Sequence, residues 1–477
     1  MRPIFLLTVI LYLFLTPYLF AQQTQKPRVI ILTDIEADPD DTQSLIRLLL
    51  YSNEVEIKGI VATTSCWLQN RIAPEYIEKV IKAYGKVRPN LLLHDKRYPE
   101  METLLGVVKK GLPKYGMTGV GEGMDSEGSD WIIDVLEEDD NRPLWISTWG
   151  GVNTLAQTLF KIRATKSKRE VSRLIGKLRV YTISDQDDSG LWIRSNFPDL
   201  FYIVSPGDNY GDATWTGINS VVDGIDNSEI SNGWLAENIQ QGHGPLGAEY
   251  PDVAWGMEGD TPAFLGIISN GLNEPEHPEW GGWGGRYELY KPDFANRKDG
   301  RSIVTIAPET RPIWTNANDT YTPYLPDEYG RAVIRDTTSF TGYKVTLWRW
   351  RDDFQNDFAA RMDWCQNSFE TANHPPVPVL TGEDHLTVNS EESIFLDASN
   401  SSDPDGDNLS FLWFNYKEAG TLKEEVLIEG SENSHIVSFN VPKVDKKETI
   451  HFILKVTDKG IPALSRYKRI IIDILPK

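Results

Sequence analysis

Cysteine and positive charge are scarce in this chain of 477 residues. The only two cysteines, Cys66 and Cys365, lie far apart and cannot form a disulfide scaffold, although export would permit them to pair. No zinc-binding spacing of His and Cys is present. Lys and Arg number 48 against 69 Asp and Glu, which gives a net charge of −21. Nucleic acid is excluded as a partner, because no basic stripe offsets the repulsion of phosphate.

Long apolar runs are missing after Phe20. The run from Ile4 to Phe20 follows Arg2 and precedes a small residue, Ala21, and polar glutamines. This order is typical of a secretory signal peptide, which we expect to cover residues 1–21. The alternative is a membrane anchor, but the run is short for a span and contains a proline. We therefore expect a secreted, periplasmic or cell-surface protein without stable membrane insertion, whose oligomeric state stays open.

Apolar runs that suit buried strands alternate with helical patterns over residues 27–372, the first predicted domain. Such alternation is typical of an α/β fold with an open, mostly parallel sheet flanked by helices. The predicted strands are 28–33, 55–64, 88–94, 143–151, 178–184 and 201–205. The predicted helices begin near Pro39 and cover about 74–84, 130–138, 152–161 and 350–367. Residues 280–343 have little periodicity, and we interpret them as long loops over the functional edge of the sheet.

A second domain is predicted after the Pro-rich linker NHPPVPV (373–379). Residues 380–477 contain strand-like runs separated by turn residues, which indicates an all-β sandwich of immunoglobulin type. Its turn DPDGD carries Asp403, Asp405 and Asp407. These carboxylates could bind calcium, but a turn alone also explains Asp and Gly here.

Tryptophan is common, with 15 residues, and two of them lie in PEWGGWGGRY. Aromatic faces stack on sugar rings as well as packing in cores. Trp280 and Trp283 are therefore candidates for contact with a carbohydrate.

The stretch TDIEADPDDTQSL concentrates carboxylates where the first predicted strand gives way to the first predicted helix. They are Asp34, Glu36, Asp38, Asp40 and Asp41. Helix capping explains Asp38, and the positive helix N-terminus suits Asp40 and Asp41. It leaves Asp34 and Glu36 unexplained at the carboxyl end of the strand, where ligands bind in open α/β sheets. Oxygen-only ligands suit a hard cation such as Ca²⁺.

VIILTDIEADPDD resembles the N-terminal signature of nucleoside hydrolases, D-x-D-x-x-x-D-D, with matches at Asp34, Glu36, Asp40 and Asp41. The longer text is similar to a narrower family of secreted bacterial proteins, described as cellulose-binding with a nucleoside-hydrolase-like domain. STWGGVNTLAQTL, MEGDTPAFLG, HGPLGAEYP and NEPEHPEWGGWGGRY also resemble that family, as does a trailing immunoglobulin- or cadherin-like domain.

The resemblance implies calcium-assisted hydrolysis of a glycosidic bond. It places Asp41, Asp260, Glu36 and the Trp149 carbonyl at the metal. Glu36 and Asp40 are the implied catalytic residues: Glu36 takes a proton from water, and Asp40 binds a sugar hydroxyl.

The chain departs from the hydrolase pattern at several positions. Residue 36 is Glu instead of Asp, Gly259 stands where the hydrolases carry His, and Ser65 and Cys66 stand where a sugar-binding Asn is expected. Asn196 is the candidate for a later sugar-binding Asn.

Further candidates for substrate binding are Asp34, Asp185 and His243. We therefore predict a calcium-dependent hydrolase of glycosidic bonds, N-ribosyl-like or in a glycan. The alternative is a non-catalytic protein that binds cellulose or another polysaccharide.

Overall fold

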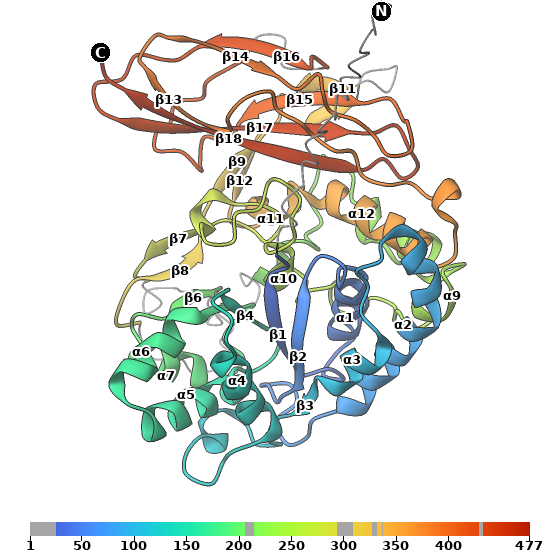
Figure 1. Cartoon of the computed structure of the whole chain (residues 1–477), viewed down its shortest axis with the longest axis vertical. Helices are drawn as coiled ribbons and strands as arrows, with labels where there is room; N and C mark the ends of the chain where they lie inside the picture. Colours follow the sequence, from blue (N-terminus) through green and yellow to red (C-terminus); the bar gives the residue numbers. More distant parts are fainter. Residues whose placement is uncertain (1–24, 206–213, 293–308, 327–331, 336, 429–432) are drawn as a thin grey trace, which may run out of the picture.

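The computed structural model describes residues 25–205, 214–292, 309–326, 332–335, 337–428 and 433–477. The predicted signal peptide lies outside the described residues. Figure 1 shows two lobes: an α/β domain that reaches to α12 and a β-rich domain that carries the C-terminus. None of the helices in the described ranges is both long and apolar enough to cross a membrane.

The α/β domain is built on one sheet with the strand order β3-β2-β1-β4-β5-β6-β8-β7. Neighbouring strands are parallel except for β7 and β8, which are antiparallel. The strands are β1 Arg28–Thr33, β2 Glu56–Ala62, β3 Val108–Lys110, β4 Leu144–Thr148, β5 Leu178–Thr182, β6 Phe201–Val204, β7 Tyr287–Tyr290 and β8 Ile313–Asn316. The predicted mostly parallel α/β sheet is confirmed.

Helices cover both faces of this sheet (Figure 1). The longer ones are α1 Asp40–Leu50, α2 Pro74–His94, α3 Met101–Gly106, α4 Glu127–Glu137, α5 Asn153–Thr165, α6 Lys168–Lys177, α7 Ser189–Asn196 and α12 Arg351–Asp363. Single turns are α8 Asn232–Leu235, α9 Gly244–Gly247, α10 Pro262–Leu265 and α11 Val345–Trp348. Alternate residues of β1 divide the two cores: Val29 and Ile31 pack on the α1 and α2 side, and Ile30 and Leu32 on the α4 and α5 side.

The strand predicted at 88–94 is wrong, because these residues form the end of α2. Of its three consecutive leucines only Leu91 is buried, while Leu93 is half exposed, as expected of a helix face. Pro89 does not break this helix. An apolar run this short cannot by itself distinguish strand from helix.

The loops predicted at 280–343 are in part strands. β7 and β8 extend the sheet beyond β6, at the edge opposite β3. Two further strand pairs follow, β9 Asp319–Tyr321 with β12 Phe340–Gly342, and β10 Tyr324–Pro326 with β11 Ala332–Arg335. The prediction of loops over the functional edge is therefore wrong for these described residues.

The C-terminal domain consists of a four-stranded sheet, β13-β18-β17-β15, and a two-stranded sheet, β14-β16. Its strands are β13 His385–Asn389, β14 Ser393–Asp397, β15 Ser410–Asn415, β16 Ile436–Asn440, β17 Glu448–Thr457 and β18 Ser465–Leu475. A separate apolar core that includes Trp413 and Phe452 lies between the sheets. The predicted all-β character is confirmed, and the immunoglobulin type stays a prediction.

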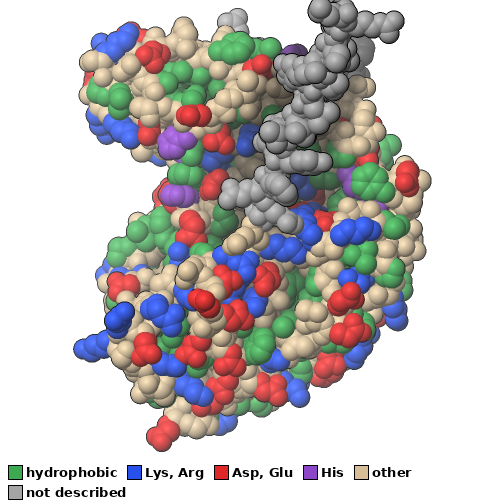
Figure 2. All heavy atoms as spheres, in the orientation of Figure 1, with side chains coloured by type: hydrophobic (Ala, Val, Ile, Leu, Met, Phe, Trp, Pro, Cys, Tyr) green, Lys and Arg blue, Asp and Glu red, His purple; other side chains and the backbone are tan. Residues whose placement is uncertain are grey.

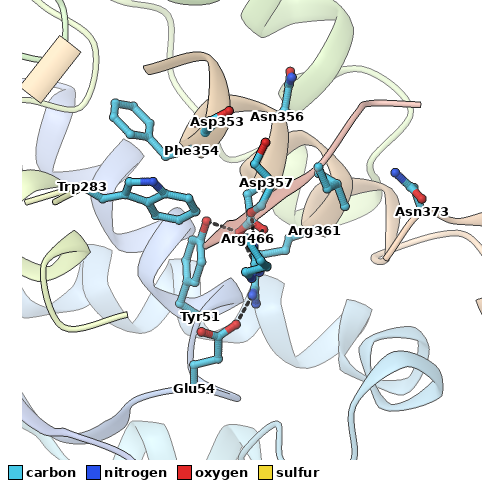
Figure 3. A network of polar contacts seen from close by, with 12 residues as sticks. Tyr51, Glu54, Trp283, Asp353, Phe354, Asn356, Asp357, Arg361, Asn373 and Arg466 are labelled. Atoms are coloured by element: carbon cyan, nitrogen blue, oxygen red, sulfur yellow. Dashed lines mark hydrogen bonds and ion pairs between the residues drawn. The ribbon is translucent and has the colours of Figure 1, made fainter. Parts of the chain in front are cut away.

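The two domains share buried contacts, so the junction between them is part of the fold. Tyr416 and Tyr467 of the C-terminal domain belong to the main core of the α/β domain. Asp357 of α12 binds Arg466 of β18 at 2.7 Å, Arg361 at 2.9 Å and the Tyr51 hydroxyl at 2.5 Å (Figure 3). Burial raises the pKa of Asp357, but the charges of Arg466 and Arg361 outweigh it and hold this pKa well below its usual range.

The predicted linker is fastened to the C-terminal domain. The Asn373 side chain donates to the Asp458 carboxylate, and the backbone of Val377 pairs with that of Ser402. At the DPDGD turn, Asp403 accepts the backbone N–H groups of Asp405 and Asp407. The Asp405 carboxylate is bound to His374. These bonds support a turn role for Asp403 and Asp405, but Asp403 Oδ2 is buried without a partner among the described residues, so calcium at this turn stays an open alternative.

Candidate functional site

The candidate site lies where the winding of the sheet reverses. β2 and β3 lie on one side of β1, and β4, β5 and β6 follow on the other. Asp34 comes directly after β1, and the turn at Trp149 to Gly151 directly after β4. A Cβ at Gly150 would lie 2.4 Å from Asp34 Oδ1, so a glycine is required for this close approach. Ligands bind at such a switch point, beyond the carboxyl ends of the strands.

A cluster of aspartates occupies this point, and we call it the acid cluster. Its members are Asp34, Asp38, Asp40, Asp41 and Asp260. Carboxylate oxygens of Asp38, Asp40 and Asp41 lie within 4.8 Å of one another. Asp260, from the turn before α10, is buried beside them and interacts electrostatically with all four. The structure thus brings together Asp34, Asp40, Asp41 and Asp260, as the resemblance implied.

Local bonds hold the cluster in place. The Thr33 hydroxyl, at the end of β1, donates to the Asp41 carboxylate and accepts the backbone N–H of Ile35 at 3.1 Å. Asp38 accepts the backbone N–H of Asp40 at 3.3 Å, which ties it to the first residue of α1. The predicted capping role of Asp38 is wrong, because Pro39 is the N-cap of α1 and no side chain caps the helix. Asp38 belongs instead to the acid cluster, which was not predicted.

Proximity and burial make the cluster costly to ionise. Burial raises the pKa of Asp34 to about 6, the charge of Asp38 adds to the shift, and a hydrogen bond with Ser65 opposes it. Burial and the neighbouring carboxylates raise the pKa values of Asp40, Asp41 and Asp260 well above the usual range. Like charges at this separation disfavour ionisation unless a positive charge joins them.

The residues present fit a hard divalent cation. No ion pair between described residues includes a member of the acid cluster. Asp260 Oδ2 is buried without a hydrogen-bond partner in the described part of the chain, and so is Gln186 Oε1. Gln186 donates through Nε2 to the Trp149 carbonyl, so both residues lie at this edge of the sheet. An oxygen-only donor set is the kind that Ca²⁺ prefers.

Glu36 lies apart from this donor set. Its backbone is left-handed, with φ of 77°, and it borders an outer hollow together with Asp38, Lys79 and Glu249. Lys79 lies close enough for the Glu36 charge to affect its pKa. The group of close carboxylates contains Asp38 instead. Glu36 is therefore outside the closest carboxylates, and its implied role as metal ligand and base stays a prediction.

Gly259 explains why no His stands at this position. A Cβ there would lie 2.5 Å from Asp40 Oδ2 and 3.1 Å from Trp215 Cβ, so no larger side chain fits without displacing them. The Trp215 ring packs against Gly256 and Gly259. The glycine thus admits an indole next to Asp40, where the hydrolases carry an imidazole.

Three predicted substrate residues lie outside the acid cluster. Both oxygens of Asp185 bind Arg194, at 2.8 and 2.9 Å, in a buried pair, so this acid has a structural role. Asn196 is the last residue of α7, which leads from the carboxyl end of β5 back toward the amino ends of the strands. Its side-chain oxygen accepts a hydrogen bond from Arg163. His243 precedes α9 and binds Asp363 of α12 at 3.1 Å. The structure gives these three residues protein partners, and their assignment to substrate binding stays a prediction.

The two tryptophans of PEWGGWGGRY lie at the domain junction. Trp283 is fully buried, with Phe354 and Tyr467 at its edges, so it cannot stack on a polysaccharide. Trp280 is half-buried and stacks on His277, with ring centroids 3.8 Å apart. Their role in this structure is packing, and the prediction for Trp283 is wrong.

Sequence reasoning missed three residues of the site. In the sequence, helix capping is a sufficient explanation for Asp38, and Gln186 is an uncharged residue between Asp185 and Asp187, which are stronger candidates as ligands. Trp215 approaches Asp40 only because residue 259 is a glycine, which no local pattern reveals.

The cysteines Cys66 and Cys365 are both free, and burial raises the pKa of the Cys66 thiol to about 12.

Comparisons with known proteins agree with this geometry. The family model described as "Cellulose-binding Sde182, nucleoside hydrolase-like domain" matches residues 28–287. The chain belongs to this family. The model described as "Cellulose-binding protein Sde0182, C-terminal domain" matches residues 393–474, so both domains of the Sde182 family are represented.

A solved structure from Saccharophagus degradans is similar over nearly the whole chain. It is described as a nucleoside hydrolase-related hypothetical protein that is associated with carbohydrate metabolism. It is 35% identical, covers 94% of this chain and 100% of its own, and has a TM-score of 0.77. A sialyltransferase from a Photobacterium species matches 19% of this chain at 16% identity and a TM-score of 0.15, which carries no argument. No curated protein matches the chain.

Proposed function

We propose that this protein is a secreted, calcium-dependent hydrolase of glycosidic bonds, N-ribosyl-like or in a glycan. The observation that carries the proposal is the acid cluster, with the buried and unpartnered Asp260 Oδ2, at the switch point of a nucleoside-hydrolase-like sheet.

Asp38, Asp41 and Asp260 are the side chains that would hold the cation, joined by the Trp149 carbonyl. Such an ion supplies a more acidic water and a template for sugar hydroxyls when it is bound. Asp40 lies at the rim, partly exposed, where it can accept a hydroxyl hydrogen bond or the proton of a water. Trp215, beside Asp40, offers an apolar face for the sugar ring.

A second candidate is non-catalytic carbohydrate binding. Two observations favour it: Glu36 lies outside the group of close carboxylates, and Gly259 leaves no acid to protonate a leaving group at that position. The description of the family as cellulose-binding agrees with it. In this reading the cation and the acid cluster fix sugar hydroxyls without turnover.

One assay separates the two. Protein stripped with a chelator and reloaded with Ca²⁺ is incubated with a panel of nucleosides and of neutral oligosaccharides, and reducing sugar is measured. The hydrolase proposal expects release that requires Ca²⁺ and is lost in Asp41→Asn but kept in Asp134→Asn, an exposed acid of α4. Calcium-dependent retention of a sugar without release would establish the binding alternative. Release that survives Asp41→Asn would contradict the assignment of the site.

Secretion is part of the same proposal and has its own test. Expression of the full chain in a bacterium should yield a mature protein whose N-terminus follows Ala21. A chain that retains residues 1–21 in the cytoplasm would contradict it.

A further inference from the structure

A second hollow, which we call the junction groove, lies between the two domains and shares no residue with the acid cluster. It has a volume of about 430 Å³, within the range of small-molecule sites. The α/β domain contributes Tyr321, Tyr324, Arg349 and Trp350, and β15 of the C-terminal domain contributes Leu412 and Phe414. Figure 2 shows, on the face in view, that the surface is hollowed between the two lobes.

The walls of the junction groove are rich in aromatic rings. Phe414 is half-buried and lies 6.2 Å from both Trp350 and Tyr324, measured between ring centroids. Tyr321 lies in the same wall. Such faces are the groups that stack on the C–H faces of sugar rings.

The same walls contain buried donors without an acceptor. Trp350 is 3% exposed, and its Nε1 has no hydrogen-bond partner among the described residues. The Nε of Arg349 is likewise unpartnered, although another nitrogen of this guanidinium binds Asp319 at 3.1 Å. Both atoms are enclosed by protein, so they do not themselves contact a ligand in the groove, and recognition there falls to the accessible ring faces and polar groups of the lining.

Charge at the junction groove is balanced. Lys455 of β17 binds Asp353 of α12 at 2.6 Å. The lining contains equal numbers of acids and bases: Asp352, Asp353 and Asp458 against Arg349, Lys455 and Lys459. A phosphate group would be repelled by the carboxylates of the lining, and a polycation by its basic groups. A neutral ligand that carries many hydroxyls can both donate to the carboxylates and accept from the nitrogens.

The junction groove continues into a smaller hollow of about 140 Å³. The two share Tyr321, Tyr324, Arg349 and Phe414. The smaller hollow adds hydroxyl groups from Thr320, Thr322 and Ser339. Together the two hollows offer aromatic walls and several hydroxyl groups over a larger area than either does alone, which suits a chain of several sugar units.

We propose that the junction groove binds a segment of a neutral polysaccharide, separately from the acid cluster. This inference rests on the carbohydrate binding proposed above, and it assigns the contact with the polymer to the domain junction instead of the acid cluster. The sandwich domain then forms one wall of the site and has a direct part in recognition.

Binding of cellohexaose by calorimetry, and retardation of the full-length protein in native gels that contain hydroxyethylcellulose, test this proposal. We expect Phe414→Ala to weaken cellohexaose binding at least tenfold. The matched control is Phe395→Ala, since Phe395 is a 65% exposed aromatic on β14, away from the groove. Asp41→Asn should bind the glucan as the unmodified protein does.

A second variant guards against misfolding. Leu412→Arg adds bulk and charge at a half-buried wall position, and it should abolish retardation while the melting temperature stays close to that of the unmodified protein. Unchanged binding in Phe414→Ala and Leu412→Arg would overturn the proposal, as would the absence of any binding by the unmodified protein. Loss of binding in Asp41→Asn alone would place the glucan at the acid cluster, which overturns the junction groove and leaves the proposed function standing.

Discussion

Replacing Asp41 by Asn should have opposite effects on the stability of the protein with and without calcium. Asp41 is buried, and its Oδ1 accepts a hydrogen bond from the Thr33 hydroxyl. An Asn side chain has the same shape and keeps this acceptor. The substitution therefore removes one negative charge from the acid cluster without creating a cavity or an unpaired hydroxyl.

The magnitude follows from the geometry. Two unit charges at the 4.8 Å that bounds the oxygens of Asp38, Asp40 and Asp41 repel by about 3–4 kcal/mol at an effective dielectric constant of 20. Proton uptake already relieves part of this, because the pKa values of Asp40 and Asp41 are raised. We expect Asp41→Asn to gain about 1–3 kcal/mol in chelator at neutral pH. With Ca²⁺ at about 100 times its dissociation constant, the unmodified protein should gain ~2.7 kcal/mol and the variant little.

Thermal unfolding followed by calorimetry, in chelator and in Ca²⁺, measures both effects. The control is Asp134→Asn, at an exposed position of α4, which should behave as the unmodified protein in both conditions. A variant that melts lower than the unmodified protein in chelator, or one that is still stabilised by Ca²⁺, would refute the account of the acid cluster as a repulsive site completed by a cation.

Two further predictions concern the domain junction. Arg466→Met should lower the free energy of unfolding by about 2–3 kcal/mol in denaturant titration. This is less than the ~3–5 kcal/mol expected when a buried charge loses its partner, because Arg361 and Tyr51 still bind Asp357. A change below about 0.5 kcal/mol would contradict this prediction. Burial and the charge of Arg469 lower the pKa of His451 to about 3. The unfolded state therefore binds more protons than the folded state between pH 6.5 and 3. The free energy of unfolding should thus decrease as the pH is lowered through this window, by about 2 kcal/mol between pH 7 and pH 5. His451→Gln should flatten that slope, and an unchanged slope would exclude His451 as its source.

The sequence predicted the architecture because its signals are local. Continuous apolar runs such as 28–33 mark buried parallel strands, and the motif that follows the first strand places acids at the carboxyl edge of the sheet. The α/β sheet and the later all-β domain were predictable on this basis, whereas the meeting of Asp41 with Asp260 was implied only by the resemblance to nucleoside hydrolases. The failure at 88–94 has the same origin, since three leucines in a row suit a strand and a helix face equally.

The rest depends on partners that are distant in sequence. Nothing in the stretch ISDQDDSG shows that Asp185 pairs with Arg194 while Gln186 turns to Trp149. Glu36 has a left-handed backbone and lies outside the group of close carboxylates, and the motif reveals neither property. The burial of Trp283 likewise follows from the docking of Tyr467 of the second domain.

Calorimetric titration of chelator-treated protein with CaCl₂ tests the central claim most directly. We predict a single site per chain that is lost in Asp41→Asn and in Asp260→Asn and kept in Asp407→Asn at the DPDGD turn. Calcium binding that survives both substitutions in the acid cluster, or that disappears in Asp407→Asn, would contradict the account.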